Sequence, residues 1–107
     1  MANIELQKNM NLIVLYDLYK NMLTVKQQKY FEYYYFEDFT LQEIANEFNV
    51  TRAAIFDSII KTQQIIENLE NKLNVKSNYE KIRVLLTKYA EKHGKDEDIE
   101  KILEVIS

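Results

Sequence analysis

The sequence contains no cysteine, no proline and a single glycine, Gly94. Without cysteine, disulfides and thiolate metal sites are excluded, and we expect a reducing, cytoplasmic environment. Without proline and with one glycine, little interrupts long helices, which favours an all-α fold. The 107 residues leave room for a single helical domain, 1–107, with one modest core.

Long hydrophobic runs and an excess of positive charge are also missing. No apolar run approaches the roughly 20 residues that a membrane-spanning helix needs, so we expect no membrane insertion. The formal net charge is −3, and between Thr24 and Lys76 six basic side chains stand against eight acidic ones. Domains that bind phosphates are usually basic, so this charge weakens the case for a simple DNA reader.

Helix-start signals predict six helices, the first at about 4–19 and the fourth from Thr51 to about Asn74. In a capping box, the side chains of two residues satisfy free backbone N–H groups at a helix start. Capping boxes are predicted at Thr24 with Gln27, Thr40 with Glu43, and Ser77 with Glu80. Thr51 and Asp96 are expected to cap two further helices, Asn49 to adopt a left-handed turn, and Gly94 to end the fifth helix.

The segment 40–62 has the pattern of a helix-turn-helix. A short helix from Thr40 to Phe48, a turn at Asn49 and a second helix from Thr51 match two helices packed at a steep angle. Such a motif leaves one face of the second helix free to enter a groove.

Two resemblances to known families follow from these motifs. Three motifs resemble region four of bacterial sigma factors: Leu23-Thr-x-x-Gln, Thr40-x-x-Glu43-Ile44-Ala45, and Val50-Thr51 through Ile66. Over about 4–75 the sequence also resembles the YlxM family. The motifs that carry this resemblance are Tyr33-Tyr-Tyr-Phe-Glu-Asp-Phe-Thr-Leu-Gln-Glu-Ile-Ala and Phe56-Asp57 after Thr51-Arg52.

The resemblances imply an all-α fold with a sigma-region-four-like core at 24–66 and extra N-terminal and C-terminal helices. They also imply a regulatory role in the signal recognition particle pathway, with the RNA of that particle as a preferred target. DNA and the protein components of the particle are further candidate partners. Asn49 stands where the family carries glycine, a substitution that costs little if asparagine adopts the same backbone region.

The free arc of the second helix predicts two kinds of contact. A groove reader needs arginine, asparagine or glutamine for base edges and basic groups for phosphates. Candidate nucleic-acid residues are Thr40, Thr51, Arg52, Ala53 and Lys61, with the Thr40 and Thr51 amides as anchors at helix starts. Phe56, Asp57 and Ile60 are candidates for protein contact, with a partner or with the first helix; the alternative is that the two apolar side chains belong to the core.

A second candidate surface lies near the C-terminus. Lys81, Lys88, Lys92 and Lys95 fall within an arc of about 60° at 100° per residue. Between Asn78 and Lys95 five basic side chains stand against two acidic ones, and such stripes attract phosphate backbones. The alternative is an ordinary solvated helix face. Tyr33 and Tyr35 could stack on unpaired bases, but a core role is the commoner one.

Neither catalysis nor a bound metal or cofactor is predicted. His93 lies near Asp96, Glu97, Asp98 and Glu100, but the spacing matches no zinc or calcium motif, and acidic groups in a first turn complement the helix dipole. There is no glycine-rich phosphate loop and no recognisable nucleophile arrangement. We therefore expect a nucleic-acid-binding regulator; the alternative is a protein-binding adaptor that uses the same scaffold without reading bases.

Finally, the pattern predicts a homodimer. The apolar stripe of the fourth helix continues through Ile66, Leu69 and Leu73 beyond the helix-turn-helix, and the first helix is apolar on more than one side. A small monomer would struggle to cover both surfaces. The rival explanation is that the fifth and sixth helices cover the stripe within one chain.

Overall fold

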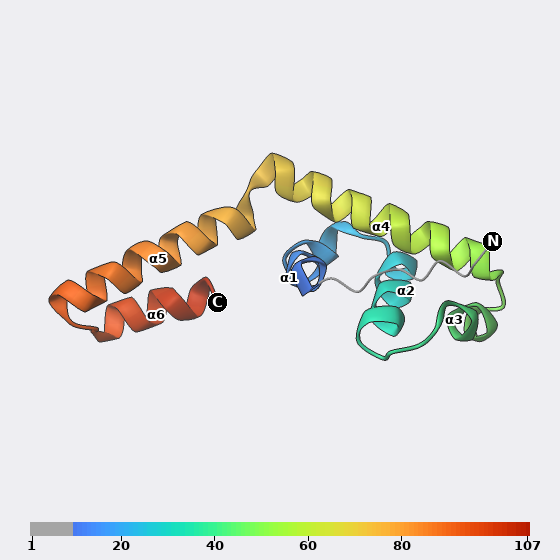
Figure 1. Ribbon diagram of the computed structural model, residues 1–107, viewed down its shortest axis with the longest axis horizontal. Helices are drawn as coiled ribbons and strands as arrows, with labels where there is room; N and C mark the ends of the chain where they lie inside the picture. The colour runs from blue at the N-terminus through green and yellow to red at the C-terminus, as the bar shows by residue number, and fades with distance from the viewer. Residues whose placement is uncertain (1–9) are drawn as a thin grey trace. The chain divides into compact units, whose positions relative to one another are not determined.

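The computed structural model describes residues 10–107, and within that range the chain is helical with no strand (Figure 1). The all-α expectation is confirmed; positions 4–9 of the expected first helix lie outside the described residues. The elements are α1 (Met10–Tyr19), a 3-10 turn (Lys20–Met22), α2 (Val25–Tyr35), α3 (Leu41–Phe48), α4 (Arg52–Leu73), α5 (Val75–His93) and α6 (Glu97–Val105).

The chain divides into two compact units, Met1–Lys72 and Leu73–Ser107. We call them the N-terminal unit and the C-terminal unit and describe each by itself. The N-terminal unit holds α1 to α4 almost entire, and the C-terminal unit holds α5 and α6. The helix-turn-helix expected at 40–62 lies wholly inside the N-terminal unit.

Local side-chain caps define the helices of the N-terminal unit. Thr24 and Thr40 both form the predicted capping boxes, with Gln27 and Glu43 respectively. Thr51 caps α4, because its Oγ1 accepts a hydrogen bond from the Ala54 N–H at 3.1 Å. Each bond satisfies a backbone donor that the helix itself leaves free.

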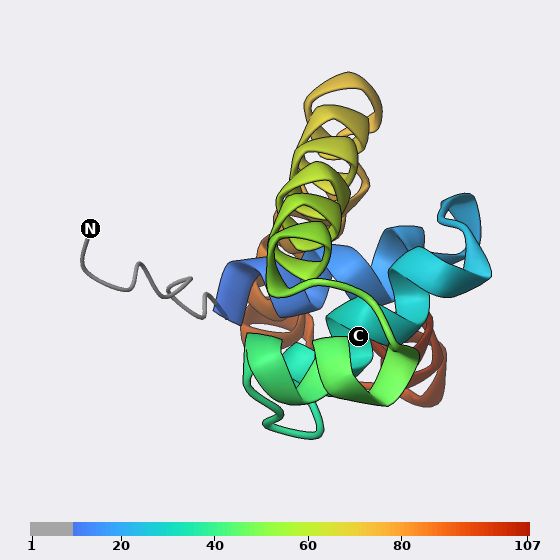
Figure 2. The ribbon, with the colours of Figure 1, turned by 90° about the vertical axis from the view of Figure 1, so that its right-hand side faces the viewer.

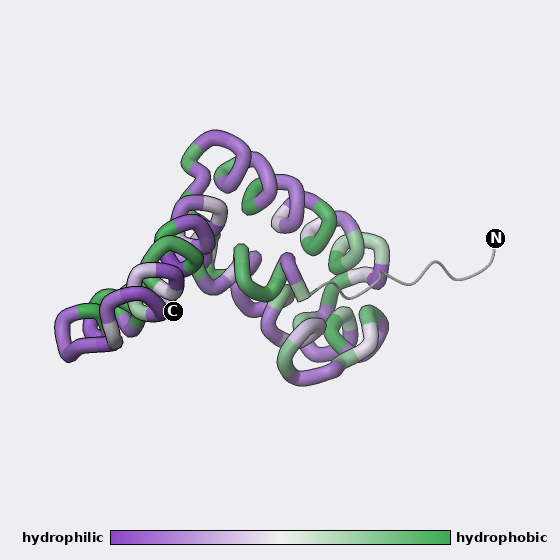
Figure 3. The backbone as a smooth tube through the Cα atoms, turned by 60° about the vertical axis from the view of Figure 1, so that its left-hand side comes forward, coloured by the Kyte–Doolittle hydropathy of each residue, from purple (hydrophilic) through white to green (hydrophobic). Residues whose placement is uncertain are grey.

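The core of the N-terminal unit combines one aliphatic stripe with an aromatic cluster. Ile55, Ile59 and Ile66 of α4 are fully buried, as is Phe31 of α2. The Phe31 ring stacks on Tyr16 at 4.2 Å between ring centres. In Figure 3 the hydrophobic segments of α4 recur turn after turn along its length, as expected of a helix that buries one stripe.

Buried tyrosines in this core keep their hydroxyls hydrogen-bonded. The Tyr16 hydroxyl donates to the Glu32 carboxylate, and the Tyr19 hydroxyl donates to Glu70 Oε1 at 2.7 Å, which ties α1 to the last turns of α4. Burial, reinforced by the hydrogen bond to Glu32, raises the pKa of Tyr16 above its ordinary value. These bonds satisfy polar groups whose burial would otherwise be costly.

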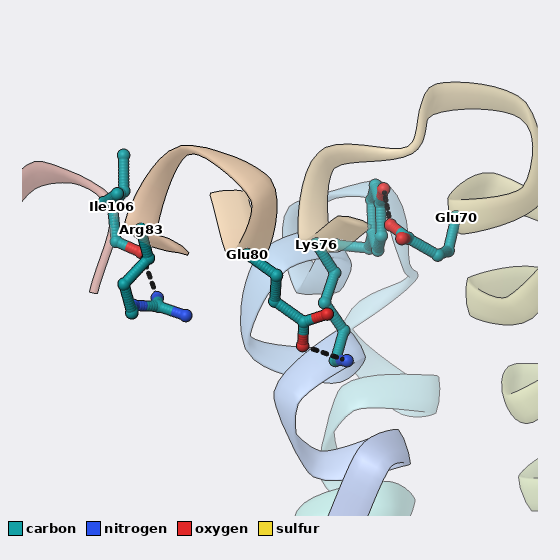
Figure 4. A network of polar contacts seen from close by, with 6 residues as sticks. Glu70, Lys76, Glu80, Arg83 and Ile106 are labelled. Carbon is teal, nitrogen blue, oxygen red and sulfur yellow. Dashed lines mark hydrogen bonds and ion pairs between the residues drawn. The ribbon is translucent and has the colours of Figure 1, made fainter. Parts of the chain in front are cut away.

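The start of the C-terminal unit differs from the expectation. The predicted Ser77–Glu80 capping box is wrong: α5 already begins at Val75, preceded by Asn74 in a left-handed conformation with φ 55°. Glu80 instead pairs with Lys76 one turn earlier, Nζ to Oε1 at 2.7 Å (Figure 4). A serine followed three residues later by glutamate also occurs inside helices, where it caps nothing.

The other end of the hairpin follows the prediction. Gly94 ends α5 with φ 85°, and Asp96 caps α6 by accepting a hydrogen bond from the Ile99 N–H at 2.9 Å. Arg83 of α5 donates from Nη2 to the Ile106 carbonyl at 2.7 Å (Figure 4). Helices α5 and α6 are therefore antiparallel, with the end of α6 beside the middle of α5.

The apolar residues of the hairpin are only partly buried. Ile99 and Ile106 are buried and Leu86 and Leu103 are half-buried. Ile82, Tyr89 and Ile102 are exposed. Two helices bury one seam only, so residues a quarter-turn from that seam stay in solvent.

Candidate nucleic-acid interface

The helix-turn-helix is formed by α3, the turn at Asn49–Thr51 and the first part of α4, which Figure 2 shows from the side of α3. Asn49 adopts the left-handed region with φ 56°, and the Val50 N–H donates to the Ala45 carbonyl at 3.0 Å. This hydrogen bond closes the end of α3. The left-handed turn predicted at Asn49 is therefore confirmed.

The two helix starts of the motif differ as anion sites. The Thr40 amide donates to Glu43 Oε1 at 2.9 Å, so a carboxylate already lies at the start of α3. This arrangement argues against the expected anchoring of a phosphate by the Thr40 amide, because that donor is engaged and the acid would repel a second anion. The first turn of α4 contains no acidic residue and includes Arg52, which leaves its positive dipole end unneutralised.

The free arc of α4 carries the remaining candidates of the motif. Ala53, Asp57 and Lys61 are exposed, whereas Arg52, Phe56 and Ile60 are half-buried. At 100° per residue Asp57 lies near the centre of the arc, between Ala53 and Lys61. This surface therefore offers cationic groups at its ends and a carboxylate at its middle.

The lysine stripe on α5 is solvent-exposed. Lys81, Lys88 and Lys92 are exposed and lie on one side of the helix, and none of them forms an ion pair within the described part of the chain. Lys95 is also exposed but follows Gly94, beyond the end of α5. Its expected place on the helical stripe is therefore wrong, because the helical period ends at His93.

The two tyrosines considered for base stacking differ in burial. Tyr35 is buried, its ring stacks on Phe31 at 4.3 Å, and its hydroxyl accepts a hydrogen bond from Gln63 Nε2 at 2.6 Å. Burial raises the pKa of Tyr35 above its ordinary value. Tyr33 is half-buried and its ring stacks on Phe39 at 5.0 Å. Tyr35 is therefore a core residue and offers no platform to a base.

The three residues expected at a dimer interface are not equivalent. Ile66 is fully buried, so its role in contact with a second chain is wrong. Leu69 is half-buried and Leu73 is exposed. The stripe thus changes from core to surface along the last two turns of α4.

The described residues also bear on metal binding and on membrane insertion. Among them, no group of three or more histidine, cysteine, aspartate or glutamate side chains is placed to hold a metal ion. His93 instead packs against the Tyr89 ring at 4.5 Å. Within the same range, no helix combines the length and apolar character that crossing a bilayer requires.

The blocked start of α3 is the feature that our sequence reasoning missed. The signal was present, since a capping box with glutamate at its third helical position necessarily brings a carboxylate to the first backbone amide. The same motif therefore predicts both where α3 begins and why that start does not attract phosphate.

Comparison with known proteins agrees with this architecture. Residues 6–106 match the UPF0122 family, described as "Putative helix-turn-helix protein, YlxM / p13 like". The chain is 39% identical over 93 residues to the UPF0122 protein YofM of Lactococcus lactis subsp. lactis, covering 87% of this chain and 84% of that protein.

Two further relatives extend the comparison. A UPF0122 protein of Streptococcus gordonii is 38% identical over 103 residues, covering 96% of this chain and 94% of that protein. One of Mycoplasma capricolum is 45% identical over 83 residues, covering 78% and 74%. The chain therefore belongs to the UPF0122 family of YlxM/p13-like helix-turn-helix proteins.

Proposed function

We propose that this protein is a regulatory helix-turn-helix protein that binds nucleic acid, with RNA of the signal recognition particle preferred over DNA. Family membership supports the helix-turn-helix class. The preference for that RNA rests on the resemblance to YlxM proteins and on the exposed lysine stripe of α5. The observation that carries nucleic-acid binding is the start of α4, where Arg52 joins an acid-free first turn.

The chemistry of that start suits a phosphate. Arg52 supplies a guanidinium that can bind two phosphate oxygens, and the exposed Thr51 and Ala53 leave space for a backbone to approach. The unneutralised helix dipole adds a favourable field. The start of α3 has no arginine, and the Glu43 carboxylate already lies there. The geometry therefore favours a single contact, between the start of α4 and the phosphate backbone of one strand.

The alternative is a protein-binding adaptor, and one observation favours it. The centre of the free arc is Asp57, with Phe56 and Ile60 half-buried beside it. A carboxylate flanked by apolar groups repels phosphate but suits a basic, partly apolar protein surface. The two functions therefore make opposite predictions for removal of the Asp57 charge.

The experiment measures RNA binding by fluorescence anisotropy, with signal recognition particle RNA, a control RNA of the same length and a DNA duplex. For a phosphate contact, affinity falls steeply between about 50 and 200 mM salt. Arg52→Ala should weaken binding about uniformly across sequences and lower the salt dependence of the affinity, as the loss of one phosphate contact does. Lys29→Ala, which removes one exposed charge from α2, is the matched control and should bind like the parent.

Asp57→Asn distinguishes the two candidates in the same assay. If α4 faces nucleic acid, removing the central carboxylate strengthens binding; Glu37→Gln, which removes an exposed acid outside the motif, should not. If Arg52→Ala binds RNA and DNA like the parent, the start of α4 is not the contact. If Asp57→Asn instead abolishes capture of a basic protein partner and leaves RNA affinity unchanged, the adaptor function holds.

A further inference from the structure

The C-terminal unit has an apolar face that its own two helices do not cover. On α5, Ile82, Leu85 and Tyr89 are 40%, 65% and 51% exposed, and on α6 Ile102 and Val105 are 43% and 77% exposed. Single exposed apolar residues are normal, but a contiguous group is the mark of an interaction surface.

Helix geometry places them together. Ile82, Leu85 and Tyr89 follow the i, i+3, i+7 spacing of one helical ridge. Counted at 100° per residue from the more buried side of each helix, both exposed sets are displaced in the same rotational sense. In antiparallel helices, displacement in the same sense brings both sets to the same side of the pair. The hairpin therefore has one apolar face built from α5 and α6.

The hairpin is also too small to be stable without further contacts. Domains below about 40 residues usually need disulfides, a metal or oligomerisation, and the C-terminal unit, Leu73–Ser107, is shorter than that. The sequence has no cysteine, and the described residues contain no metal-binding cluster. Burial of the apolar face would supply that stability.

Charge indicates what covers this face. Helix α5 carries five basic and two acidic side chains, whereas α6 carries one basic and four acidic ones. The C-terminal unit as a whole carries seven of each sign and is neutral. A neutral unit whose charges are segregated onto its two helices complements a second copy of itself, since α5 of one copy can lie on α6 of another.

We propose that the apolar face of α5 and α6 binds the same face of a second copy of this chain, forming an antiparallel four-helix bundle. A two-fold axis parallel to the helices places basic α5 on acidic α6 of the partner, with Ile82, Leu85 and Tyr89 in the seam. The other two-fold arrangement would place α5 on α5 and oppose like charges. This proposal does not rest on the proposed function.

The test is the mass of the intact protein, measured by analytical ultracentrifugation from low to high micromolar concentration. The parent should sediment with twice the mass of one chain. Leu85→Asp should shift the protein to a monomer throughout that range. Val84→Asp is the matched control, because Val84 is 53% exposed but lies on another side of α5, and this variant should remain a dimer.

Crosslinking keeps the test decisive if Leu85→Asp loses helicity. Because the protein has no cysteine, Ile82→Cys introduces a unique thiol close to the proposed axis. A short bis-maleimide crosslinker, which can span two helices that face each other diagonally across the bundle, should give a covalent dimer for Ile82→Cys and none for Val84→Cys. A parent that stays monomeric at high micromolar concentration, or a dimer that both aspartate variants leave intact, would overturn the proposal.

Discussion

The two units of this protein use the same kind of helix but bury very different shares of it. In the N-terminal unit, Phe31, Ile44 and Ile59 have no exposed surface. In the C-terminal unit, Ile99 and Ile106 are buried while most of the other large apolar residues remain in contact with solvent. Four helices can surround a stripe, whereas two can cover only the seam between them. An apolar stripe thus predicts burial only when enough helices surround it.

The largest expected effect tests this difference directly with the same substitution in each unit. Ile59→Ala should cost about 2–5 kcal/mol of unfolding free energy, because it leaves a cavity in a filled core. Ile82→Ala, at a site already 40% exposed, should cost much less at protein concentrations below those that favour self-association. Urea unfolding followed by circular dichroism checks both. Equal losses would mean that the C-terminal unit has a core as tight as the other.

The next prediction tests which of the two units binds RNA. Replacing Lys81, Lys88 and Lys92 by glutamine should lower affinity by about tenfold, or about 1.4 kcal/mol, and flatten its salt dependence. The matched control replaces Lys26, Lys29 and Lys72, which are exposed in the N-terminal unit, and removes the same charge. Anisotropy at low salt measures both. Unchanged affinity for the α5 variant would assign binding to the helix-turn-helix alone.

The smallest effect tests whether the units unfold independently. Thr40→Ala should cost about 1 kcal/mol in the N-terminal unit, since it removes the hydroxyl that accepts from the Glu43 N–H. Asp96→Ala removes the corresponding bond in α6 and should speed hydrogen exchange in the C-terminal unit only. Exchange measured by mass spectrometry resolves the two. Faster exchange in α2 or α3 of the Asp96 variant would show that the units are coupled.

Local motifs were the most predictable part of the structure. Thr24, Thr40, Thr51 and Asp96 all cap the helices expected of them, because each side chain reaches a backbone N–H only three residues away. Ser77 is the exception, because the left-handed Asn74 starts α5 earlier. Nothing in the Ser77–Glu80 pattern itself distinguishes a helix start from a helix interior.

For the candidate site, the sequence predicts which residues belong to it but not how exposed each of them is. The sequence places Arg52, Asp57 and Lys61 on the free side of α4, and the structure agrees in leaving the latter two exposed. The sequence could not separate Tyr35, which is buried, from Tyr33, which is half-buried. Neighbouring residues on one helix differ in burial according to which other helices pack beside them.

What the sequence alone determined is the helical class, the helix-turn-helix and the turn at Asn49, because those depend on hydrogen bonds between residues at most five positions apart. Only the tertiary structure decided which faces are covered. Tyr19 bonds to Glu70 across 51 positions and Tyr35 to Gln63 across 28. Such contacts make Ile66 a core residue and leave Leu73 on the surface, because burial depends on distant segments that a local pattern does not contain.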